Sequence, residues 1–164
     1  MRGAASVLLV MAVLLAACAA TDTPTPTARA SIPPGLESIA AAYLDLVAPA
    51  NAATCNMNVV LSKSAPALAD LKRGSVDYAA ALATHIDGLR AMPWPPELIE
   101  DANDLIDALV VDETHTRAMA EADSFDTFIE ADNALIASNS VSSAAAARIR
   151  KDLGLPIAEV PCPA

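Results

Sequence analysis

The chain has 164 residues, which suggests one domain, and its 10 basic and 20 acidic residues give a net charge of −10. This balance argues against a nucleic-acid binder, because neutralising phosphates requires a basic surface. Hydrophobic residues make up 54% and charged residues 18%, which argues against a disordered chain, and three cysteines are too few for a disulfide-dense scaffold.

Residues 1–17 have the pattern of a signal peptide. Arg2 provides a short positive region, and an apolar run over 4–17 follows it. A membrane-spanning helix needs roughly twenty apolar residues, so this run fits the hydrophobic region of a cleaved signal better than a membrane span.

The next residues carry a more specific pattern. Leu15-Ala16-Ala17-Cys18 resembles the bacterial lipobox, in which a branched residue and two small ones precede a cysteine. The resemblance implies cleavage before Cys18 and lipidation of its sulfur and new amino group, which would hold the protein on the extracytoplasmic face of a bacterial membrane. The alternative is an ordinary secretory signal in which Cys18 is incidental.

Residues 18–34 are predicted to be a lipidated cysteine and a tether. The segment alternates Thr and Pro over 23–27 and ends in Pro33-Pro34, followed by Gly35. Prolines at this density favour extended polyproline II, and the segment cannot bury enough apolar surface to fold. We therefore expect a spacer between the membrane and a folded domain over 35–164.

The folded domain has helical periodicity nearly throughout, with apolar residues recurring at spacings of three and four. We expect helices over about 36–61, 66–91 and 97–122 and a fourth from about Phe125 to Leu153. Together they predict an all-α, antiparallel up-down-up-down four-helix bundle. Pro49 falls inside the first helix and is expected to kink it, because proline removes a backbone donor.

Several residues are predicted to mark the ends of these helices. Ser64 and Ser124 are candidate N-caps of the second and fourth helices, and Gly154 is a candidate for the residue after the last turn of the fourth. Gly74-Ser75 is a candidate interruption of the second helix.

Cys55 and Cys162 remain once Cys18 is lipidated. Two thiols outside the cytoplasm usually pair, so we expect a disulfide that ties the C-terminal tail to the middle of the first helix. The alternative is a reactive thiol pair, although neither cysteine belongs to a C-x-x-C motif.

His85 is the most suggestive single residue for ligand binding. It falls on the core-facing side of the second helix, two turns beyond Tyr78, and both side chains can bind metal or haem. The simpler interpretation, which we favour, is a histidine satisfied by a neighbouring hydroxyl or carbonyl. Asp112 and His115 also share a helix face, but the repeated Glu-x-x-His pattern of a di-iron bundle is absent, so no metal site or cofactor is predicted.

The third helix carries a cluster of acidic side chains that could dock a protein partner. Like charges three and four residues apart repel one another, and this local cost makes a functional interpretation attractive, either cation binding or docking of a basic partner. The interpretation that we favour is a solvated face whose acidic residues complement the helix N-terminus. The candidate partner-binding residues are Glu97, Glu100, Asp101, Asp104 and Asp107. The fourth helix has a polar stretch, Asn139, Ser140, Ser142 and Ser143, which is either a groove lining or an exposed side.

No catalytic motif occurs in the chain, so we do not expect an enzyme. Beyond the lipobox, the chain resembles small Ala-rich lipoproteins of high-G+C bacteria. This resemblance implies a fold and a cellular location, and no activity. The segments that carry this resemblance are Ala48-Pro49-Ala50-Asn51, Pro93-Trp94-Pro95 and Arg150-Lys151-Asp152-Leu153-Gly154-Leu155-Pro156.

Taken together, these patterns predict a membrane-anchored lipoprotein that acts as a non-catalytic protein-interaction module with a partner in the cell envelope. The alternative function is a carrier that holds a small ligand, metal or haem between the helices near Tyr78 and His85.

Overall fold

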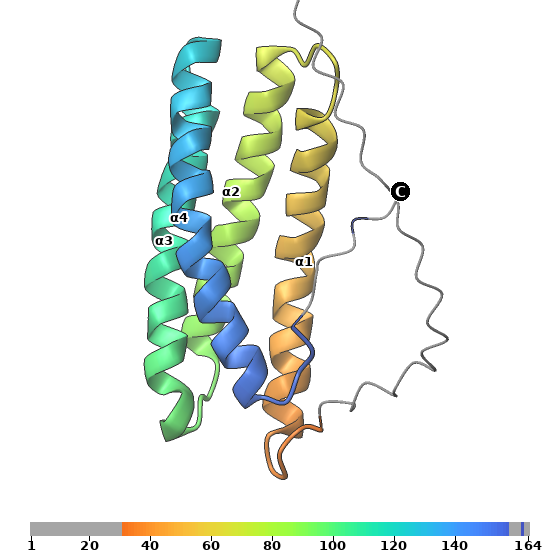
Figure 1. The fold of residues 1–164 in the computed structure, drawn as a ribbon, viewed down its shortest axis with the longest axis vertical. Coiled ribbons are helices and arrows are strands. Elements are labelled where there is room, and N and C mark those ends of the chain that lie inside the picture. Colours follow the sequence, from red (N-terminus) through yellow and green to blue (C-terminus); the bar gives the residue numbers. More distant parts are fainter. Residues whose placement is uncertain (1–30, 158–161, 163–164) are drawn as a thin grey trace, which may run out of the picture.

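The computed structural model describes residues 31–157 and Cys162. This part of the chain is all-helical, with four long helices packed against one another, as the periodicity predicts (Figure 1). The helices are α1 (Glu37–Leu61), α2 (Leu68–Ala91), α3 (Ile99–Glu121) and α4 (Phe125–Asp152), and a short 3-10 helix, η1 (Pro96–Leu98), precedes α3.

The helices pack in chain order, which leaves one side of the bundle open. α1 lies against α2, α2 against α3, and α3 against α4, whereas α1 and α4 make few contacts with each other. Figure 1 shows consecutive helices running in alternating directions, with α2 visible behind the space between α4 and α1. The opening between α1 and α4 is the feature that positions the candidate site.

The helix ends agree in part with the sequence. Ser124 caps α4, since its side chain accepts a hydrogen bond from the backbone N–H of Thr127, and its own backbone N–H donates one to the Thr127 hydroxyl. Gly154 follows α4 with a positive φ of 65°, where a Cβ would collide with the backbone of Ser31. The end of the expected tether thus lies against the end of α4.

The observed limits of α1 and α2 differ in part from those expected from the sequence. Ser64 is not an N-cap, because α2 begins later, after Ala67. Gly74 does not interrupt α2, which is continuous; the absent side chain instead leaves room for Met57 of α1. Pro49 lies inside a single continuous α1, and the kink that we expect there stays a prediction.

The core is divided into two clusters along the bundle. The larger lies around the N-terminal half of α1 and the C-terminal half of α4, and includes Tyr43, Leu89, Leu105 and Ile149. The smaller lies at the opposite end of the helices and centres on Phe128. Alanine and glycine allow the helices to approach closely, as at Gly88, where a Cβ would collide with Leu46.

The disulfide predicted from the cysteine count is present. Cys55 of α1 is bonded to Cys162, with Cα atoms 5.2 Å apart and a sequence separation of 107. The chain leaves α4, passes Ile157 and returns to α1, so the C-terminal tail is attached to the helix that borders the open side.

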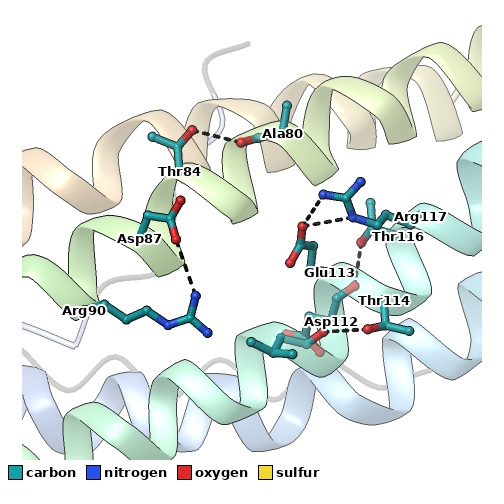
Figure 2. A network of polar contacts seen from close by, with 10 residues as sticks. Ala80, Thr84, Asp87, Arg90, Asp112, Glu113, Thr114, Thr116 and Arg117 are labelled. Atoms are coloured by element: carbon teal, nitrogen blue, oxygen red, sulfur yellow. Dashed lines mark hydrogen bonds and ion pairs between the residues drawn. The ribbon is translucent and has the colours of Figure 1, made fainter.

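Polar contacts on the outer surface are mostly local. Figure 2 shows several on α2 and α3, and each joins residues three or four apart on one helix, as in the ion pair of Arg117 with Glu113 and the pair of Arg90 with Asp87. Exposed pairs of this kind contribute little to stability. No helix within the described residues is long and apolar enough to cross a membrane.

Candidate functional site

A pocket of about 260 Å³ opens where α1 and α4 diverge. All four helices contribute to its wall, and Ile157 of the C-terminal tail borders it as well. The apolar part of the wall is formed by Val47, Leu82, Leu105, Leu109 and Ala146.

The wall also carries polar side chains, two of which meet at one end. Tyr43, near the start of α1, lies against Arg150, near the end of α4. His85 occupies the corresponding part of α2. Thr54, Tyr78 and Asn139 line the other end of the pocket.

Arg150 is a buried cation at the first of these ends. Its side chain is 9% exposed, its Nη1 donates a hydrogen bond of 3.2 Å to the backbone oxygen of Pro156, and its Cζ lies 5.7 Å from the centroid of the Tyr43 ring. These contacts hold the guanidinium in one position. Among the described residues no carboxylate forms an ion pair with it.

His85 is a buried imidazole with an unsatisfied nitrogen. The residue is 7% exposed, and within the described part of the chain its Nε2 has no hydrogen-bond partner. Desolvation by burial lowers the pKa of His85 to about 4, so the ring is neutral at pH 7. Among the described residues, no hydroxyl or carbonyl therefore takes the role that the simpler interpretation gives it at Nε2.

The two tyrosines of the pocket are also shifted by burial. Desolvation raises the pKa of Tyr43, and the Arg150 guanidinium opposes part of that rise. Burial likewise raises the pKa of Tyr78, while a hydrogen bond with Thr54 works against it. Both phenols therefore stay protonated at neutral pH and present hydroxyl groups rather than charges.

Asp112 lies behind the wall of the pocket rather than in it. The residue is 1% exposed, and its two oxygens accept hydrogen bonds of 2.5 Å from Ser138 and 2.6 Å from Ser142. Ser142 itself lines the pocket. Asp112 is thus held by α4. Its hydrogen-bond partners are these two serines, and not the half-buried His115 on its own helix.

The acidic residues of α3 are partly engaged within the protein. Arg148 of α4 donates to Asp101 and Asp104, each at 2.6 Å, which links α3 to α4. Glu97, Glu100 and Asp107 remain exposed.

The polar stretch of α4 lies partly in the pocket wall and partly on the exposed side of the helix, the two locations that the sequence leaves open. Asn139, Ser142 and Ser143 line the pocket, whereas Ser140 is exposed and bonds only to the backbone of its own helix.

Sequence reasoning identified Tyr78 and His85 but missed Arg150 and Tyr43. Arg150 carried the signal of a basic residue in the last turn of a helix, which is ordinarily explained by the helix dipole. The missed signal is its spacing of seven residues from Ser143, which places both on one face of α4.

Comparison of the chain with protein-family models, with curated proteins and with solved structures finds no match. In the described residues no group of three or more His, Cys, Asp or Glu side chains is arranged to hold a metal ion. The function is therefore inferred from the geometry of the pocket.

Proposed function

We propose that this protein is a lipid-anchored extracytoplasmic binding protein that holds a small organic ligand in the pocket between α1 and α4. The observation that carries the proposal is the buried Nε2 of His85, which has no partner among the described residues and belongs to a pocket wall. Leaving a buried polar group unpaired costs about 1–3 kcal/mol, so such groups in folded proteins usually meet a ligand or an ordered water.

The dimensions and chemistry of the wall favour an organic ligand over a metal or haem. Ligand pockets for drug-sized molecules measure roughly 300–1,000 Å³. At about 260 Å³ this pocket suits something smaller, and haem is larger than such molecules. A metal ion would need further ligands beside His85, and the described residues offer no such group.

A protein-interaction role for the acidic surface of α3 ranks behind this proposal. Asp101 and Asp104 are already paired with Arg148, so a basic partner would have to displace that contact before it gained their charge. Exposed ion pairs are weak, but the competition lowers the gain from binding.

The anchor is the second part of the proposal, and it rests on the lipobox resemblance alone, since Cys18 lies outside the described residues. Two or three acyl chains on Cys18 would attach the domain stably to a membrane, where a single chain would not. The acidic mature chain would add nothing through anionic lipids.

The anchor is tested by intact-mass measurement on the full-length chain recovered from bacterial membranes. We expect a mature chain that begins at Cys18 and carries acyl mass, and a Cys18→Ala variant that retains its leader and carries none. A mature chain that begins at another residue, or one without acyl mass, contradicts the anchor and leaves the pocket proposal intact.

The pocket proposal is tested by filling the pocket. Ala147 lines it, whereas Ala144, one turn earlier on α4, is exposed and does not. We expect small neutral, cationic or anionic organic fragments to bind the wild-type chain Ala19–Ala164 and Ala144→Trp, and to lose binding to Ala147→Trp. Ligand-observed NMR provides the measurement, with circular dichroism confirming that both variants remain helical. Equal binding to all three proteins, or no binding at all, would overturn the proposal.

A further inference from the structure

The charge of the described pocket wall is positive, although the chain as a whole is acidic. The net charge is −10, yet no Asp or Glu among the described residues lines the pocket. Arg150 does, and it is nine-tenths buried. A desolvated cation without a carboxylate partner among the described residues is costly, and a bound anion relieves that cost.

The guanidinium is held ready for such an anion. Arginine has five N–H donors in a rigid planar fork that matches a carboxylate, and Pro156 takes one donor on Nη1. The stacking of Arg150 on Tyr43 restricts the side chain further. Since the side chain is already ordered, little conformational entropy is lost when the ligand binds.

The remainder of the wall defines the other half of the ligand. Part of it is apolar, with Leu82, Leu105 and Leu109 contributing, so it favours an apolar body over a sugar or a nucleotide. A cavity of about 150 Å³ holds one benzene, and by proportion about 260 Å³ holds roughly ten non-hydrogen atoms.

We propose that the ligand of this pocket is a small monocarboxylate with an apolar body of about this size, its carboxylate at Arg150 and a further polar contact at His85 Nε2. This inference rests on the proposed function, because it names the ligand class of the same pocket. A doubly charged phosphate is disfavoured, since the described wall supplies one full positive charge and no second arginine or lysine.

The test compares octanoate with octanamide, which has the same length and no charge. On the chain Ala19–Ala164, isothermal titration calorimetry is expected to show octanoate binding at least about tenfold more tightly than octanamide, because bonds to charged groups add about one to two powers of ten in affinity. Arg150→Gln should remove that difference and reduce octanoate binding by about 10- to 100-fold.

Arg150 also contacts Pro156 of the tail, so Arg150→Gln could change the packing of the tail as well as remove the charge. A second pair of variants therefore leaves Arg150 in place. Ala147 lies three residues before Arg150 on the same face of α4, so Ala147→Glu places a tethered carboxylate beside the guanidinium. Ala147→Gln has the same size without the charge. We expect octanoate to bind Ala147→Glu at least about tenfold more weakly than Ala147→Gln, octanamide to bind both equally, and Ala144→Glu to behave as wild type.

The outcomes separate the two proposals. Suppose that small fragments bind wild type and that Ala147→Trp abolishes this binding. If octanoate then binds no more tightly than octanamide, or binds Ala147→Glu and Ala147→Gln equally, the carboxylate inference is wrong and the binding function stands. If no fragment binds in that manner, both fall together.

Discussion

Removing the Cys55–Cys162 disulfide is expected to lower the free energy of unfolding by as much as about 4 to 5 kcal/mol. The bond closes a loop with a sequence separation of 107, and in the chain-entropy model a loop of about 100 residues contributes roughly 4.7 kcal/mol by restricting the unfolded chain. Domains of this size are stable by only about 5–15 kcal/mol, so the loss would be a large fraction of the total.

Urea unfolding of the chain Ala19–Ala164 measures this effect. The variant replaces both cysteines by alanine, and the wild-type protein treated with a reductant serves as the control that removes the bond without changing the side chains. Both should unfold at a lower urea concentration than the oxidised wild type, and coincident unfolding curves for all three would refute the expected contribution.

The second large effect concerns His85 and acid. Its folded-state pKa, about 4, lies below the usual 6.5 because burial penalises the charged ring. Between these values the unfolded chain binds a proton that the folded chain does not, so stability falls as the pH falls from 6.5 toward 4. The full difference corresponds to about 3 kcal/mol.

Carboxylates titrate over part of the same range, so the measurement is a difference between variants. Free energies of unfolding at pH 7 and pH 4 are compared for wild type and His85→Gln. We expect His85→Gln to lose less stability on acidification than wild type, by about 3 kcal/mol at most. An unchanged pH dependence in His85→Gln would show that the imidazole is already paired.

The two effects meet at the pocket. The tail that the disulfide attaches to α1 includes Ile157 in the wall, and Pro156 holds Arg150. The covalent link therefore stabilises the bundle and also restrains the chain next to the cation. A protein without the disulfide would still have helices, but less constraint on the open side.

Local chemistry explains why part of this structure could be predicted. Periodicities of three and four residues specify helices because each helix must bury one apolar face. Ser124 followed by Asp126 in the first turn was sufficient to place the start of α4. The disulfide followed from the number of cysteines, since the lipobox resemblance assigned Cys18 to the anchor and left Cys55 and Cys162 to pair.

Where prediction failed, the cause was competition between neighbouring helices. Ser64 is a good capping residue, but α2 begins later, at Leu68, which packs against the smaller core cluster. The partners of Asp112 were not predicted at all: the serines of α4 hold it. Neither partner is visible along the sequence, because Ser138 and Ser142 lie 26 and 30 residues further along the chain.

The sequence by itself determined the all-helical class, the approximate helix limits, the pairing of the two cysteines, and Tyr78 and His85 as residues of interest, because these depend on local spacing and composition. Only the tertiary structure decided that α1 and α4 stand apart, that His85 Nε2 is left without a partner in the described chain, and that Arg150 turns into the pocket. The physical reason is that desolvation and charge pairing depend on which helices meet, and four amphipathic helices can bury their apolar faces in more than one arrangement.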